Sequence, residues 1–104
     1  MQIDLPRARR EQLRWLILLT LNRARPEAVA EDLPLGVARS IYPDATVLEL
    51  RRELDYLAGR ELVECKRLPS GQWFCKLSRH GVDVAEYTSE CEPGIARPEK
   101  YWAD

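Results

Sequence analysis

The chain has 104 residues, of which 45% are hydrophobic and 32% are charged. This length suffices for one domain with a modest core, and it excludes a nucleotide-binding fold joined to a separate substrate domain. The 16 basic and 17 acidic residues give a formal net charge of −1, which argues against a surface that attracts nucleic acid over its whole area.

The charges are unevenly distributed along the sequence. Six arginines against two acids give residues 1–25 a net charge of +4, and four arginines against eight acids give residues 26–63 a net charge of −4. Residues 64–80 carry four basic residues and one acid (+3), whereas residues 81–104 carry two basic residues and six acids (−4). The net charge therefore does not exclude a nucleic-acid ligand, because the positive charge is concentrated in two blocks.

The longest apolar run, Trp15–Leu19, is far shorter than the roughly 20 apolar residues of a membrane span. No small-residue cleavage site follows it, so it is not typical of a signal peptide. We therefore expect a cytoplasmic protein. The three cysteines have no C-x-x-C spacing, and free thiols are expected in a reducing compartment.

Hydrophobic periodicity predicts three helices in the first sixty residues. The first extends over residues 6–25, where apolar residues recur along one helical stripe. A short second helix begins with Asp32 as its cap and ends before Pro43. The third has Thr46 as its N-cap, with a glutamate three residues later, and continues to about Arg60.

The sequence after the third helix has a different character. Two short β-prone runs, residues 62–68 and 73–77, flank a turn at residues 69–72 that contains glycine, which predicts a β-hairpin. A last helix is expected over residues 79–87, and residues 88–104 are expected to form an irregular tail.

This order of elements predicts an α+β fold of the winged helix-turn-helix type: a three-helix core, a two-stranded hairpin as the wing, a C-terminal helix and an irregular tail. In such an arrangement the third helix lies across the core, so that its outer side can enter a DNA major groove about 12 Å wide. We assign residues 1–87 to the winged-helix domain and residues 88–104 to a tail that packs on the domain or on a partner subunit.

Three segments carry a family resemblance. The run Leu50-Arg-Arg-Glu-Leu-Asp-Tyr-Leu-Ala-Gly-Arg-Glu-Leu-Val63 resembles the recognition helix and first wing strand of many winged-helix regulators. Leu77-Ser-Arg-His-Gly-Val-Asp-Val-Ala85 and Pro93-Gly-Ile-Ala-Arg-Pro98 resemble segments of small ArsR-like winged-helix proteins of Mu-like phages and prophages. The resemblance implies a small DNA-binding regulator of transcription.

Double-stranded DNA is therefore the expected partner. On the third helix, arginine can bond a guanine edge bidentately, and on the hairpin, basic side chains suit phosphate contact. The predicted DNA-binding residues are Thr46, Arg51, Arg52, Tyr56, Lys66, Arg67, Ser70, Lys76 and Arg79.

Two features of the sequence keep an alternative open. Glu49 and Asp55 on the third helix would approach phosphates unfavourably, and they have the spacing to pair with Arg52 and Arg51 on a solvated face. Winged helices also serve as protein-interaction modules, so the alternative function is protein binding without DNA binding.

We predict no enzymatic activity, no cofactor and no metal site. His80 is the only histidine, and no catalytic motif is present. Cys65 and Cys75 can face one another on paired strands in one register, which allows a redox or metal switch, although buried thiols are the simpler interpretation. Trp73 and Phe74 are neighbours on a strand, so at least one is expected to face the core.

Three apolar residues of the first helix lie outside its stripe and need a partner. Either the tail, through Ile95 and its aromatic residues, or a second subunit covers them. Exposed apolar surface of this kind marks an interface, and we predict a homodimer. The predicted interface residues are Trp15, Leu18, Leu19, Tyr101 and Trp102.

Overall fold

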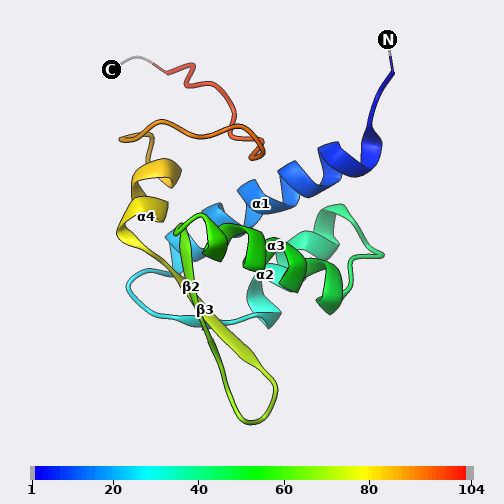
Figure 1. Ribbon diagram of the computed structural model, residues 1–104, viewed down its shortest axis with the longest axis vertical. Helices are drawn as coiled ribbons and strands as arrows, with labels where there is room; N and C mark the ends of the chain where they lie inside the picture. Colours follow the sequence, from blue (N-terminus) through cyan, green and yellow to red (C-terminus); the bar gives the residue numbers. More distant parts are fainter. Residues whose placement is uncertain (1, 103–104) are drawn as a thin grey trace.

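The computed structural model describes residues 2–102, and over this range the chain forms four α-helices and a three-stranded antiparallel sheet (Figure 1). The α+β class expected from the sequence is confirmed. The elements, in chain order, are α1 (Leu5–Ala24), β1 (Val29–Ala30), α2 (Asp32–Ile41), α3 (Val47–Gly59), β2 (Val63–Arg67), β3 (Trp73–Leu77) and α4 (Arg79–Ala85).

Side-chain caps fix where three of the helices begin. Asp4, Thr46 and Ser78 each accept a hydrogen bond from a backbone amide three residues later, which satisfies one of the amides left unpaired at a helix start. The prediction that Asp32 caps α2 is wrong: Asp32 is the first helical residue, and Glu31 stands at the cap position without capping. The Glu31 carboxylate is instead bound by groups outside the helix, which are described below.

The hairpin β2–β3 lies where the sequence predicts it, and it has one face toward the core and one outer face. Its strands pair with Cys65 opposite Cys75 and Lys66 opposite Phe74. Side chains alternate across the sheet. Cys65 and Cys75 therefore lie on the face toward the core, whereas Lys66 and Phe74 lie on the outer face. Gly71 in the connecting turn has φ +91°, a conformation that favours glycine.

Strand β1 was not expected from the sequence. It is only two residues long, too short to carry an alternating pattern, and it pairs with β3 on the edge opposite β2. The sheet order is therefore β1-β3-β2, with β3 in the middle.

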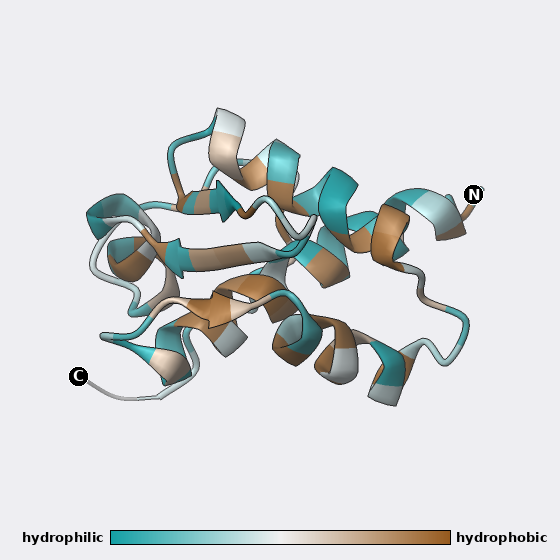
Figure 2. Cartoon of the chain, turned by 90° about the horizontal axis from the view of Figure 1, so that it is seen from below, coloured by the Kyte–Doolittle hydropathy of each residue, from teal (hydrophilic) through white to brown (hydrophobic). Residues whose placement is uncertain are grey.

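Helix α1 is buried on more than one side. Figure 2 shows the apolar residues gathered where helices and strands face one another. Trp15 and Leu18 are 5% and 0% exposed within the single chain, and Ile95 of the tail belongs to the same cluster. Trp15 and Leu18, which the sequence predicts for a subunit interface, are therefore covered within this chain by its own sheet, helices and tail.

Residues 88–102 contain no helix or strand, and arginine side chains that donate to backbone carbonyl groups hold them against the domain. Arg14 donates to the carbonyl oxygen of Gly94 at 2.8 Å, and Arg97 donates to the carbonyl oxygens of Val84 and Ser89 at 3.0 and 2.9 Å. The tail lies at one end of the molecule and the hairpin turn at the other (Figure 1). Between residues 2 and 102, no helix has the length and apolar character needed to cross a membrane.

Candidate nucleic-acid interface

Helix α3 presents a narrow exposed stripe beside the hairpin. Its three leucines at positions 50, 54 and 57 are at most 1% exposed and fix the orientation of the helix. Leu48, Arg52 and Asp55 are spaced at i, i+4 and i+7 on the opposite side, and all three are exposed. Thr46 precedes this stripe, and its side chain accepts from the Glu49 amide at 3.1 Å.

Every carboxylate of α3 is paired with an arginine from another element. Arg9 makes two hydrogen bonds to Glu49, both at 2.8 Å, and Arg14 donates to Glu53 at 2.7 Å. Arg67 of the hairpin donates to Asp55 at 3.0 Å. Glu49 and Asp55, the acids expected to repel phosphates, are therefore neutralised by arginines of α1 and β2.

Arg52 differs from its neighbours on the helix. Within residues 2–102 it has no ion-pair partner, although its side chain is exposed near the middle of the stripe. The i,i+3 pairing with Glu49 that the sequence allowed is absent in this described part of the chain, because Glu49 is bound to Arg9. Arg52 is thus the cation of α3 that remains available to a ligand.

Arg51, also predicted to contact DNA, is engaged within the chain. Its guanidinium makes two hydrogen bonds to the Glu31 carboxylate, both at 2.7 Å, and a third to the carbonyl oxygen of Gly71 at 2.7 Å. Glu31 is 3% exposed and also accepts from the Trp73 amide at 2.8 Å. The bonds from Arg51, assisted by the Trp73 amide, outweigh burial and hold the pKa of Glu31 below its ordinary value.

Tyr56 lies away from the exposed stripe. Its ring is half-buried between the guanidinium groups of Arg14 and Arg60, whose central carbons are 3.5 and 4.2 Å from the ring centroid. Its hydroxyl lies beside Gly94, so closely that a side chain at Gly94 would collide with it. Tyr56 therefore faces the tail, whereas Arg52 faces outward.

The remaining predicted residues belong to the hairpin and to the start of α4. Arg67 stacks over the Trp73 ring at 4.3 Å while it pairs with Asp55. The others, which are all exposed, are Lys66, Ser70, Lys76 and Arg79.

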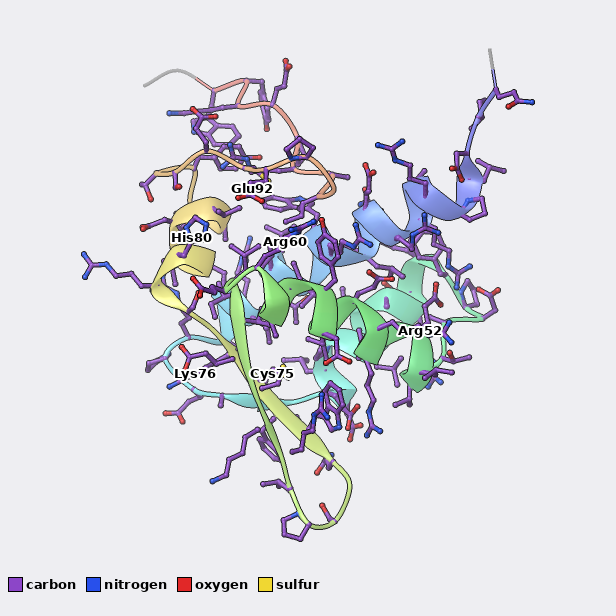
Figure 3. All side chains as sticks on the ribbon, viewed as in Figure 1. Arg52, Arg60, Cys75, Lys76, His80 and Glu92 are labelled. Atoms are coloured by element: carbon purple, nitrogen blue, oxygen red, sulfur yellow. The ribbon has the colours of Figure 1, made fainter. Side chains whose placement is uncertain are left out.

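Two adjoining hollows follow the outer face of the hairpin and share Lys76 and Glu64 in their walls. One, of about 310 Å³, is lined by Lys66 and Phe74, and the other, of about 570 Å³, by Arg25 and Arg79. Figure 3 shows Arg52 and Lys76 far apart on opposite sides of the hairpin. The structure thus places Arg52 on the α3 stripe and the predicted contact residues Lys66 and Lys76 on the outer hairpin face.

Sequence reasoning missed the residues that neutralise α3. Arg9 and Arg14 lie 40 and 39 positions before their partners, and the helical pattern of α1 gives no sign of what its polar side contacts. The opposite net charges of residues 1–25 and 26–63 are the signal in the sequence that anticipates this pairing.

The cysteines and the histidine form no metal site in the part of the chain that the structure describes, because no three ligand-type side chains come together there. Cys65, Cys75 and Cys91 are free thiols. His80 is exposed on α4, away from the α3 stripe (Figure 3).

Comparisons with protein-family models, with curated proteins and with solved structures find no match to this chain. The family resemblance of the segments 50–63, 77–85 and 93–98 therefore stays a prediction.

Proposed function

We propose that this chain is a DNA-binding protein of the winged helix-turn-helix class, acting as a small phage-type regulator of transcription. In this proposal α3 enters the major groove and the hairpin β2–β3 lies along the phosphate backbone. The observation that carries it is the charge arrangement of α3: all its acids are neutralised from other elements, while Arg52 on the exposed stripe has no ion-pair partner among the described residues 2–102.

The stripe has the chemistry to read base edges. Arg52 can donate two hydrogen bonds to the O6 and N7 atoms of guanine. Leu48, which is 60% exposed, lies beside Arg52 on the stripe. It offers an apolar surface of the kind that contacts a thymine methyl group. Thr46 stands at the helix start, where a phosphate is favoured by the free amides and the helix dipole.

The hairpin supplies contacts that position the protein without specifying sequence. Lys66 and Lys76 are exposed on its outer face, and Ser70 is exposed at the turn. Arg51 bonds the carbonyl oxygen of Gly71 in that turn, which holds the hairpin beside α3 before any ligand binds. Such pre-organisation reduces the entropic cost of binding.

The test measures binding of the full chain to duplex DNA at low salt, with Arg52→Ala and a control of equal charge change. Lys100→Ala is that control, because Lys100 is an exposed residue of the tail at the opposite end from the hairpin turn. We expect Arg52→Ala to weaken binding to a preferred site by about 1–3 kcal/mol, and Lys100→Ala to leave it unchanged.

Undetectable duplex binding at low salt, or equal losses in the two variants, would overturn the proposal. The alternative of a protein-interaction module without DNA binding would then be the function to pursue.

A further inference from the structure

The two strands of the hairpin bring two thiols together. Cys65 on β2 is the cross-strand partner of Cys75 on β3, and their Sγ atoms are 2.7 Å apart. Cys75 is completely buried, whereas Cys65 is half-buried. Cys91, the third cysteine, belongs to the tail, where its thiol donates to the carbonyl oxygen of Glu92.

The backbone geometry at this pair suits a covalent bond between the sulfurs. The Leu68 amide donates to the carbonyl oxygen of Gln72 at 2.9 Å, so these opposed residues form a hydrogen-bonded pair of the ladder. Hydrogen-bonded pairs recur at every second residue, and Cys65 lies three residues from Leu68. Cys65 and Cys75 therefore form a non-hydrogen-bonded pair, in which Cα atoms are about 4.5 Å apart, within the range that disulfides span.

The two thiols differ in reactivity. The S–H group of Cys75 donates to the sulfur of Cys65, which lowers the pKa of Cys65 in spite of its partial burial. The same contact, together with burial, raises the pKa of Cys75. Cys65 keeps part of its surface exposed on the inner side of the hairpin, whereas Cys75 keeps none, so a small reagent can reach Cys65 first. The nucleophile and the resolving thiol are thus distinguished by position and by acidity.

We propose that Cys65 and Cys75 are a redox-active pair that closes to a reversible cross-strand disulfide by exchange with a low-molecular-weight disulfide. The proposal is independent of DNA binding.

The reaction proceeds in two exchanges. The Cys65 thiolate attacks one sulfur of the reagent RSSR, a mixed disulfide forms, and one RS⁻ leaves. The Cys75 thiol then loses its proton, its sulfur attacks Sγ of Cys65, and the second RS⁻ leaves. Two protein thiols are oxidised, the reagent is reduced to two RSH, and these take up the two protons released from the cysteines.

The disulfide joins the inner faces of β2 and β3 near the middle of the hairpin. It closes the loop that contains the turn at Gly71, where Arg51 is bound. We expect the backbone amides of both strands to exchange hydrogen more slowly in the oxidised protein, because separation of the strands no longer opens the ladder.

The test incubates the folded full chain with oxidised glutathione and then labels the remaining thiols for intact-mass analysis and peptide mapping. We expect the number of labelled thiols to fall from three to one, with Cys65 linked to Cys75 and Cys91 labelled, and dithiothreitol to restore all three. Three labelled thiols after prolonged incubation, or a disulfide that includes Cys91, would overturn the proposal.

Two variants test the assignment of roles. Cys75→Ala should stop at a stable glutathione adduct on Cys65, because the resolving thiol is missing. Cys91→Ser is the matched control, and it should form the Cys65–Cys75 link as the unmodified chain does. An adduct on Cys91 alone in the Cys75→Ala variant would show that Cys65 is not the nucleophile.

Discussion

Arg14 joins three parts of the molecule through one guanidinium group. It donates to the Glu53 carboxylate of α3 and to the carbonyl oxygen of Gly94 in the tail, and it stacks on Tyr56. The side chains of Arg14 and Glu53 are 12% and 4% exposed, so water screens this ion pair poorly. Removing one partner would leave a buried charge without compensation.

We predict that Arg14→Ala lowers the free energy of unfolding by about 3–5 kcal/mol, the cost of leaving a buried charge unpaired. Urea denaturation measures the loss. The double variant Arg14→Met with Glu53→Met should lose much less, because neither charge remains. A loss below about 0.5 kcal/mol in the single variant, typical of surface substitutions, would contradict the structural role of the pair.

The pKa of Glu31 gives a prediction for pH dependence. Its folded-state pKa lies below the ordinary value of 4.5, so its ionised form stabilises the fold above that pH and the contribution is lost as the pH falls below it. Glu31→Gln should therefore destabilise the protein at neutral pH. The difference in the free energy of unfolding between Glu31→Gln and the unmodified chain should become smaller as the pH falls from 4.5 to strongly acidic values. Denaturant unfolding over this pH series measures it, and a difference that stays constant would contradict the assignment.

Helix α3 and the hairpin act together because Arg51 holds the turn of the hairpin beside the helix. Capping and periodicity predict the helices to within about two residues, and the turn glycine predicts the hairpin. Two local features escaped prediction: β1 is too short to show a pattern, and Glu31 is recruited by Arg51 rather than by its own helix. Both depend on contacts between elements distant in sequence, which the spacing of residues along one element does not encode.

The two lysines on the outer face of the hairpin are proposed to contact phosphates. Lys66→Ala and Lys76→Ala should each weaken binding to all duplex sequences alike, because phosphate contacts carry no sequence information. Each should also reduce the slope of log affinity against log salt by about 1. Binding titrations at several salt concentrations measure this, with Lys100→Ala as the control. A loss confined to one preferred sequence would show that these lysines contact bases instead.

Across the whole molecule, the net charge of −1 combines the mutually cancelling charges of residues 1–25 and 26–63 with the +3 of residues 64–80 and the −4 of residues 81–104. Arginines of the +4 segment bind acids of the −4 segment that follows it, as Arg9 does with Glu49 and Asp44. Part of the basic N-terminal segment therefore serves the fold, because Arg9 and Arg14 bind acids of α3, while Arg10 and Arg23 of α1 are exposed. The division explains why segment charges alone did not identify the candidate site.

The homodimer stays a prediction, with a changed location for its interface. Of the five residues predicted for it, Leu19 lines an apolar groove of about 430 Å³ between α1 and α2, in which Leu33 is 47% exposed. Tyr101 and Trp102 are exposed in the tail. The Trp102 ring packs edge-on against the Tyr87 ring, with the two ring centroids 4.9 Å apart.

We predict that sedimentation equilibrium gives twice the mass of one chain, and that Leu33→Glu, which places a charge in the groove, gives the mass of one chain. Ile3→Glu is the control, because Ile3 is 77% exposed before α1 and outside the groove. A single-chain mass for the unmodified protein at the concentrations used for DNA binding would contradict the dimer.

The proposed function requires that α3 reads DNA through Arg52. Selection of bound sequences from a randomised duplex library, with the unmodified chain and the Arg52→Ala variant in parallel, tests it most directly. We expect an enriched motif for the unmodified chain and loss of preference at a guanine position in the variant. Recovery of unenriched sequence from both proteins, or the same motif from both, would contradict it.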